Sequence, residues 1–243
     1  MTKKSDNLYA TKKSHLVDFV FDEAVANVFP DMIRRSVPGY ENIITMTGLF
    51  AEQFVQDDSN CYDLGCSLGA ATLALRHHIN KNNVSIIAVD NSESMIEHCQ
   101  TNITNDKSDT RVELICDDIQ NIAIQNASIV ILNFTLQFLA PEVRADLLTR
   151  IYNGMNKGAA LVLSEKVTFT DRNVRDINIQ LHEAFKRANG YSDLEISQKR
   201  SALENTLIPD TIEAHHKRLT DIGFSNVTTW FQCFNFVSIL AIK

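Results

Sequence analysis

Residues 61–69, Cys-Tyr-Asp-Leu-Gly-Cys-Ser-Leu-Gly, decide the fold of this chain. The pattern predicts a short strand that ends at Leu64, a tight turn from Gly65 to Gly69, and a helix that begins at Ala70. Glycines in such a turn let backbone N–H groups approach a ligand closely, beside the positive end of the helix dipole. The stretch therefore predicts a ligand-binding turn between a strand and a helix.

The glycine-rich turn has two interpretations. G-x-[GS]-x-G after a strand resembles the nucleotide-binding turn of Rossmann-like S-adenosylmethionine (SAM) enzymes. The same residues match the G-x-S-x-G nucleophile elbow of α/β-hydrolases, with Ser67 as nucleophile and Asp118 followed by His215 or His216 as partners. However, the turn follows the first clear strand instead of a fifth one, and no H-G-G-G-like loop precedes it. The nucleotide-binding interpretation is therefore preferred.

Apolar, β-branched runs alternate with amphipathic segments along the rest of the chain. The predicted strands are 61–64, 85–89, 111–116, 127–132 and 159–163, and the helices between them are 70–79, 93–104 and 141–154. This alternation predicts a parallel sheet with helices on both faces. A helix over 209–222 and two close strands, 224–231 and 233–242, complete the chain. The arrangement resembles the α/β, Rossmann-like fold of class I SAM-dependent methyltransferases, a seven-stranded, mostly parallel sheet with an antiparallel C-terminal hairpin.

The sequence predicts one domain with additions. Residues 1–18 are expected to form a flexible tail and residues 19–243 a single SAM-binding domain. Helical spacing predicts helices over 17–29 and 42–54, which we expect to form a lid over the carboxyl edge of the sheet. Residues 168–207 interrupt the strand–helix alternation and predict a helical insertion.

Composition excludes several classes of function. The chain has 243 residues, 44% of them hydrophobic, and a net charge of −7, so we expect no direct nucleic-acid binding. None of the five cysteines forms a C-x-x-C pair, and their odd number gives no disulfide framework, so we expect a reducing cytoplasm and no metal. No stretch is apolar enough for a signal peptide or a membrane span.

Acidic residues follow the second and third predicted strands. Asp90 lies 21 residues after Gly69 (90 − 69), where a carboxylate can accept hydrogen bonds from both ribose hydroxyls. The alternative is that Asp90, Asn91 or Ser92 caps the next helix. Asp118, in Asp117-Asp118-Ile119, is placed to meet an adenine amino group, with a solvated turn as the alternative.

Two further residues lie at predicted strand ends. Asn133 ends the fourth strand and faces the methionine end of the cofactor, with a turn-capping amide as the alternative. The following Phe134 and Thr135 do not match the N-P-P-Y motif, which disfavours methyl transfer to an amide or exocyclic amine. Asp63 can either order the glycine turn or receive the ammonium group of SAM, and the sequence does not separate these roles.

The insertion carries cations. Arginine side chains suit carboxylates, whereas a cationic sulfonium needs no such partner. If these cations reach the pocket, they indicate an anionic substrate or an anionic modified cofactor. A solvated helix face explains any single one of them better, and His182 is better explained as a packed side chain than as a base. The residues concerned are Lys186, Arg187, Lys199 and Arg200.

Taken together, the motifs resemble the carboxy-S-adenosyl-L-methionine (carboxy-SAM) synthase family from Phe19 to the C-terminus. The motifs are YDLGCSLGAAT from residue 62, IAVDNSESMI from 87, IVILNFTLQFL from 129, FKRANGYSDLEISQKRS from 185 and WFQCFNF from 230. The insertion and the lead-in FPDMI-x-RSVPGY from residue 29 are specific to this family, whereas the first three motifs indicate only the SAM fold.

The resemblance implies a reaction in which SAM and prephenate give carboxy-SAM and phenylpyruvate, for the modification of the tRNA wobble uridine (cmo5U34). It implies a homodimer in which Arg200 enters from the partner subunit and binds the new carboxylate, with Tyr40 closing the site. The implied site residues are Tyr40, Gly65, Cys66, Ser67, Asp90, Asn91, Asp118, Ile119, Asn133 and Arg200.

The resemblance also implies that no protein base is needed. Prephenate would lose CO2 and hydroxide as it aromatises, the hydroxide or an equivalent base would deprotonate the sulfonium methyl, and the ylide would attack CO2. Two other classes remain open: an ordinary SAM-dependent small-molecule methyltransferase, which would ignore prephenate, and a SAM-binding protein without catalysis.

Overall fold

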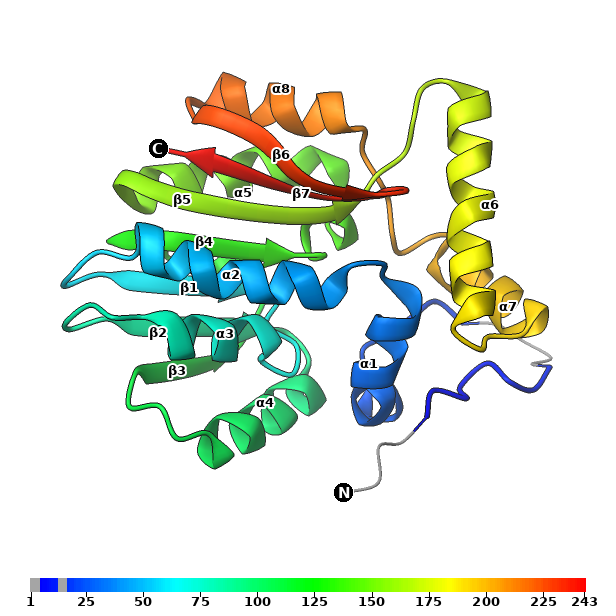
Figure 1. Ribbon diagram of the computed structural model, residues 1–243. Helices are drawn as coiled ribbons and strands as arrows, with labels where there is room; N and C mark the ends of the chain where they lie inside the picture. Colours follow the sequence, from blue (N-terminus) through cyan, green and yellow to red (C-terminus); the bar gives the residue numbers. More distant parts are fainter. Residues whose placement is uncertain (1–4, 13–16) are drawn as a thin grey trace.

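A single seven-stranded sheet forms the centre of the computed structural model, which describes residues 5–12 and 17–243. The strand order is β3-β2-β1-β4-β5-β7-β6 (Figure 1). Strands β1 to β5 pair in parallel, and β7 pairs antiparallel with β5 and β6. This confirms the predicted sheet and its C-terminal hairpin. The strands are β1 Asn60–Leu64, β2 Ser85–Asp90, β3 Arg111–Cys116, β4 Ala127–Asn133, β5 Met155–Lys166, β6 Ser225–Cys233 and β7 Phe236–Ile242.

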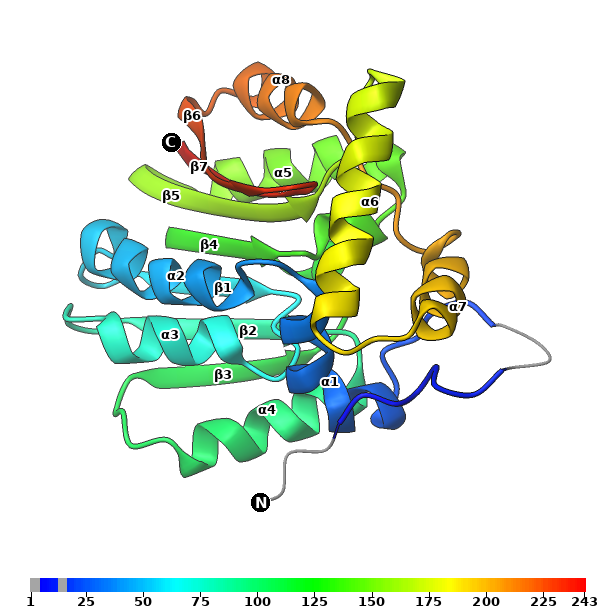
Figure 2. The same ribbon diagram turned by 45° about the vertical axis from the view of Figure 1, so that its right-hand side comes forward.

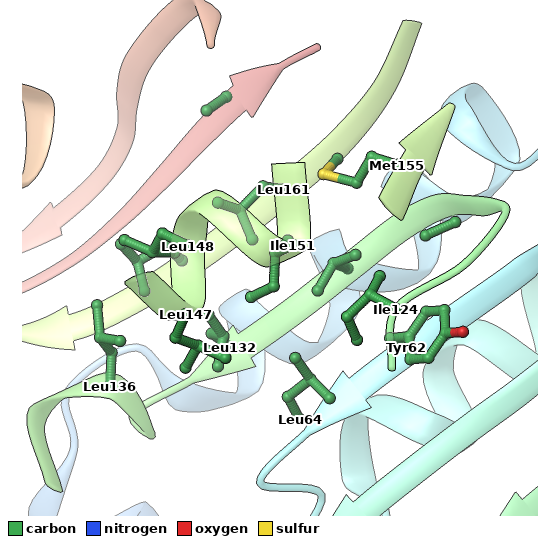
Figure 3. Close-up of a cluster of buried hydrophobic side chains, with 14 of the residues drawn as sticks. Tyr62, Leu64, Ile124, Leu132, Leu136, Leu147, Leu148, Ile151, Met155 and Leu161 are labelled. Atoms are coloured by element: carbon green, nitrogen blue, oxygen red, sulfur yellow. The ribbon is translucent and has the colours of Figure 1, made fainter. Parts of the chain in front are cut away.

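Helices cover both faces of the sheet. The α2, α3 and α4 side chains share clusters with one face, and the α5 and α8 side chains share a cluster with the other. The helices are α2 Tyr40–Phe54, α3 Ala70–His78, α4 Glu93–Asn105, α5 Pro141–Gly154 and α8 Ile212–Ile222. In β4, Ile129 and Ile131 join the first set while Val130 and Leu132 join the second, as the twofold alternation of a strand requires. Figure 3 shows the second set, where Leu147 and Ile151 of α5 lie over the sheet.

The first helix differs from its prediction. The helix expected over 17–29 is instead α1, Glu23–Ser36, which begins where Asp22 accepts a hydrogen bond from the Val25 N–H and continues through Pro30. Residues 17–22 are not helical, and Phe21 packs edge-on against Phe138. The apolar spacing was therefore misleading, because the Phe21 ring packs in a tertiary contact with Phe138 and not along a helix face.

Only part of the expected lid covers the carboxyl edge. Helix α1 lies beyond the end of the sheet to which the parallel strands point, together with the insertion helices α6, Arg172–Ala188, and α7, Asp193–Leu203 (Figures 1 and 2). In contrast, α2 packs against α3, β4 and β5 on a face of the sheet, because Ala51 of α2 and Val55, which follows the helix, share a buried cluster with those elements.

The described N-terminal residues contact the insertion. The Asp6 carboxylate is buried and accepts a hydrogen bond from the Tyr191 hydroxyl, and Gln198 Nε2 donates to the backbone oxygens of Tyr9 and Thr11, at 2.9 Å each. Residues 1–4 and 13–16 of the predicted tail lie outside the described residues. The domain boundary at residue 18 stays a prediction.

Candidate functional site

A large cavity lies at the carboxyl edge of the sheet. Its volume is about 1070 Å³, and its walls come from the ends of β2, β4 and β5 and from α1, α6 and α7. Of the residues expected in the site, those lining it are Gly65, Ser67, Asp90, Asn91, Asp118, Ile119, Asn133 and Arg200. A smaller cavity of about 460 Å³ beside residues 121–124 contains none of them.

Tyr40 and Cys66 are not among the residues lining the cavity. The Cys66 side chain points into the core beside Ala88 and Cys99. Tyr40 begins α2, and its ring packs against a cluster containing Phe134. Burial, and then the nearby Asp63 carboxylate, raise the pKa of Tyr40 above its ordinary value. The role of Tyr40 in closing the site stays a prediction.

The glycine-rich turn is held tightly against β2. The N–H groups of Gly65 and Cys66 both donate to the Val89 carbonyl, at 2.8 and 2.9 Å. Gly65 has a φ of +85°, and a Cβ on it would lie 2.2 Å from Thr135 Oγ1. Ser67 also has a positive φ, +50°. The turn thus depends on glycine at position 65, where the backbone lies close to both the β2 backbone and the Thr135 side chain.

The Ser67 side chain is not placed as a nucleophile. Its Oγ lies 3.4 Å from Met95 Sδ, and no hydrogen bond joins it to a histidine within the described residues. His215 is buried on α8 without a hydrogen-bond partner among those residues, and His216 bonds Thr229 Oγ1 at 2.8 Å. No triad forms, so the hydrolase interpretation is wrong.

Asp90 lies at the end of β2 and joins two turns. Its carboxylate accepts hydrogen bonds from the Ser67 N–H at 2.9 Å and from the Ser92 N–H at 3.0 Å. Ser92 is the residue that caps α4, by accepting from the Met95 N–H. Burial raises the pKa of Asp90, and the two N–H donors oppose that effect. A carboxylate that lines the cavity in this way can accept further hydrogen bonds from vicinal hydroxyls.

Asp118 and Asp63 are both fixed by local hydrogen bonds. Asp118 accepts from the Gln120 N–H at 2.8 Å and so caps the short helix η1, Ile119–Asn121, at the cavity wall. Asp63 is buried, accepts from Thr72 Oγ1 at 2.6 Å, and is not among the lining residues. Burial raises its pKa to about 6. Its geometry therefore favours the structural role, which is to order the strand, turn and helix.

Asn133 has an unused donor at the cavity. Its Oδ1 accepts from Ser164 Oγ at 2.8 Å, whereas its Nδ2 is buried without a partner among the described residues. Buried amide donors are nearly always hydrogen-bonded, so this atom is suited to an acceptor on a bound ligand. This donor at Asn133, the glycine turn at Gly65, and the acceptor carboxylates of Asp90 and Asp118 together fit SAM.

Arg200 lies in the last turn of α7. Its Nη1 donates to Glu183 Oε1 at 2.7 Å, and its side chain is 63% exposed. In this single chain Arg200 lines the same cavity as Asp90. Its predicted entry from a partner subunit stays a prediction.

His182 is a packed side chain, which was the preferred interpretation of the sequence. Its Nε2 lies 2.8 Å from the Ser36 carbonyl and its ring meets Phe236 edge-on at 4.8 Å. Burial, followed by the nearby lysines, lowers its pKa to about 3. A neutral ring that donates to this carbonyl explains the geometry.

Sequence reasoning missed several cavity residues. Lys166 ends β5, beyond the strand predicted to stop at 163. Gln137 is buried, and its Oε1 accepts from the Lys166 N–H at 2.9 Å. Asn235 lines the cavity with an unpartnered Oδ1 among the described residues. A cation three residues after the apolar run of β5 was a usable signal, because β2 and β4 already place polar residues at this edge.

Residues 5–12 and 17–243 contain no group of three or more His, Cys, Asp or Glu side chains that could hold a metal ion. None of their helices is both long enough and apolar enough to cross a membrane.

Comparisons with known sequences give a consistent result. Residues 62–158 match the model of a methyltransferase domain family. The chain is 58% identical over 243 residues to the carboxy-S-adenosyl-L-methionine synthase of Shewanella oneidensis, covering 100% of both chains. It is 59% identical over 238 residues to the synthase of the same name from Mannheimia succiniciproducens, covering 98% of this chain and 99% of that one.

Solved structures show the same fold at low identity. Human N-acetylserotonin methyltransferase in complex with SAM superposes with a TM-score of 0.61 and 17% identity, covering 91% of this chain and 55% of that one. A cyclopropane synthase of Mycobacterium tuberculosis gives a TM-score of 0.58 and 14% identity, covering 76% and 62%. These similarities establish the SAM methyltransferase fold alone.

Proposed function

Because the chain belongs to the family of carboxy-S-adenosyl-L-methionine synthases, we propose that it converts SAM and prephenate to carboxy-SAM and phenylpyruvate. The observation that carries this proposal is the composition of one cavity. Asp90, Asp118 and the unused amide of Asn133 suit SAM, while Arg200 adds a cation that a sulfonium ligand does not need. A methyltransferase that acts on a neutral substrate has no use for that cation.

The proposed chemistry balances without a protein base. Prephenate loses CO2 and hydroxide as its ring becomes aromatic, which leaves phenylpyruvate. The hydroxide removes a proton from the sulfonium methyl and becomes water. The methyl carbon then forms a bond to CO2, and carboxy-SAM is the product.

The chain's own residues hold, orient and shield these substrates. Asp90 and Asp118 bind the nucleoside, and Asn133 Nδ2 donates to the methionine end of SAM. Arg200 stabilises the carboxylate as it forms, which is the kind of preorganised electrostatic contribution that lowers a barrier most. Closure by α1 and the insertion excludes water, which would otherwise protonate the methyl carbanion.

The test is to incubate the protein with SAM and prephenate and to weigh the nucleotide product by mass spectrometry. A gain of one CO2, dependent on prephenate, is expected. Formation of S-adenosylhomocysteine without regard to prephenate would show an ordinary methyltransferase instead. Unchanged SAM would show a binding protein without catalysis. Either of these results contradicts the proposal.

The wider setting belongs to the same proposal. The product would serve the modification of the tRNA wobble uridine (cmo5U34) in the cytoplasm. A separate enzyme would carry out that modification, because a chain with a net charge of −7 is poorly suited to bind tRNA itself. A homodimer is supported by α6, where Val174, Ile177 and Leu181 share one helix face and are 42%, 55% and 43% exposed.

A further inference from the structure

Three lysines from three different elements line one part of the cavity. Lys166 ends β5, Lys186 lies in the last turn of α6, and Lys199 lies on α7. They are close enough to repel one another. Burial, and then the charge of Lys166, lower the pKa of Lys186 to about 8, and burial likewise lowers the pKa of Lys199 to about 8. This part of the cavity therefore concentrates positive charge in a chain whose net charge is −7.

Nearby acids compensate this charge only in part. Glu183 already pairs with Arg200 at 2.7 Å and with Arg187 at 3.5 Å. Asp6 lies 3.9 Å from Lys199 Nζ, which also donates to Ser36 Oγ at 3.1 Å. Within the described residues, Lys166 Nζ and Lys186 Nζ have neither an ion pair nor a hydrogen bond. Unpaired cations in a partly desolvated site destabilise the fold, so their presence calls for a ligand.

We propose that Lys166 and Lys186 form the subsite that holds the carboxylates of the second, dianionic substrate, with Lys199 as the third charge of the group. The inference rests on the proposed function and assigns the prephenate site within it. A cavity of about 1070 Å³ has room for a second small molecule beside the nucleoside. Phe134 and Phe236 line the same cavity and give an apolar surface for the carbon ring of the substrate.

Arg200 has a separate function in this arrangement. The lysines bind charges that the substrate brings with it, whereas Arg200 binds the carboxylate that the reaction creates. Loss of a lysine should therefore weaken binding of the dianionic substrate and leave binding of SAM unchanged. Loss of Arg200 should slow formation of the product.

The experiment compares Lys166→Met and Lys186→Met with Lys217→Met. Lys217 is the matched control, because it lies on α8 with its side chain 76% exposed and paired with Asp221 at 2.6 Å. With SAM saturating, each cavity variant should raise the KM for prephenate roughly tenfold or more, since a lysine–carboxylate hydrogen bond is lost. The SAM affinity of the cavity variants, measured by calorimetry, should stay at the wild-type value. In Lys217→Met, both the KM for prephenate and the SAM affinity should stay at the wild-type values.

Thermal melting makes the test sharper. Removing a half-buried charge that is compensated only in part should leave the melting temperature of Lys186→Met equal to or above that of the wild type, although its KM is higher. Higher KM with unchanged or higher melting temperature supports a substrate site. An unchanged KM in both cavity variants, an equal loss of SAM affinity, or a lower melting temperature overturns it.

Failure of the subsite is distinguishable from failure of the proposed function. If the wild type makes no carboxy-SAM, the proposed function fails, and the subsite is then tested by calorimetric titration of prephenate with S-adenosylhomocysteine in place of SAM. The subsite is supported if prephenate binding is weaker in Lys166→Met and Lys186→Met and unchanged in Lys217→Met. Equal binding in all variants, or none in the wild type, overturns it.

Discussion

At the residue scale, the Asp90 carboxylate connects the glycine-rich turn to the start of α4. It accepts one N–H from Ser67 and one from Ser92, and it also lines the cavity. One side chain therefore fixes the shape of the turn and, in the proposed function, presents acceptors to the nucleoside. A substitution there should affect both the fold and the affinity for SAM.

We expect Asp90→Ala to weaken SAM binding by about a hundredfold or more, because two hydrogen bonds to a charged acceptor are lost. It should also lower the free energy of unfolding by about 1–3 kcal/mol, because two N–H groups lose their acceptor. Calorimetry and urea denaturation measure the two effects. Asp117→Ala is the control, since the Asp117 carboxylate is exposed, does not line the cavity, and accepts hydrogen bonds from Asn121 Nδ2 and the Asp118 N–H. Equal SAM affinity in the two variants would contradict the assignment.

The lowered pKa values of Lys186 and Lys199, both about 8, give a second expectation at this scale. Both side chains are protonated below pH 8 and lose their charge above it. The KM for prephenate should therefore rise as the pH increases through about 8. The charged groups around Lys186 are Lys166, Lys199, Arg200, Arg187 and Glu183, and Glu183 is the one acid among them.

The stability effect has the opposite sign. Because the folded-state pKa lies below the ordinary lysine value, the unfolded chain binds more protons between pH 8 and about 10.4, and the lysine contribution to stability rises with pH in that window. Kinetics from pH 7 to 9.5 measure the KM effect, and denaturation over the same range measures stability. Lys186→Met should show a smaller change in both. An identical pH dependence in this variant would contradict the expectation.

At the scale of elements, the central strands were predicted well because they are buried on both faces. In β4, every residue from Ala127 to Leu132 is buried, so the apolar run marks the strand directly. The edge of the sheet was predicted for the same reason: Asp90 and Asn133 stand where apolar runs stop. Lys166 was missed because β5 is longer than its apolar run, and its last residues pair with β7.

Helix α1 shows what local patterns do not contain. Val17, Val20 and Phe21 fit a helical period, yet the N–H of the intervening Phe19 donates to the Ala202 carbonyl on α7, more than 180 residues away. The helix predicted over 17–29 stops before Pro30, yet α1 continues through that proline. For Phe19 a contact with the insertion outweighs local preference, and such a contact is not visible in the sequence.

Pro30 therefore provides a prediction at the element scale. It is exposed in the interior of α1 and leaves the Ala26 carbonyl without its usual N–H partner four residues later. We expect Pro30→Ala to raise the free energy of unfolding by about 1–3 kcal/mol. Thermal melting measures the change, with Ala24→Gly on the same helix as a control that should lower stability. A lower melting temperature for Pro30→Ala would mean that the proline shapes α1 for its contacts.

At the scale of the whole molecule, the cavity is built from two parts of the chain with different charges. The sheet edge supplies the carboxylates of Asp90 and Asp118, and the insertion supplies Lys186, Lys199 and Arg200. The insertion is joined to the sheet by short connections, and its helix α6 exposes an apolar face. A homodimer formed through that face would bring two insertions close to two cavities.

Whether Arg200 serves its own cavity or that of a partner can be decided by mixing two inactive variants. Asp90→Ala and Arg200→Ala should each lose carboxy-SAM formation, the second while largely keeping SAM binding. If Arg200 acts across a homodimer, a mixed dimer regains one intact site, and unfolding and refolding an equal mixture should restore about a quarter of wild-type activity. If Arg200 acts within its own chain, as its position in this structure allows, both sites of a mixed dimer stay defective and no activity returns. Full activity of Arg200→Ala alone would instead contradict the role given to this side chain.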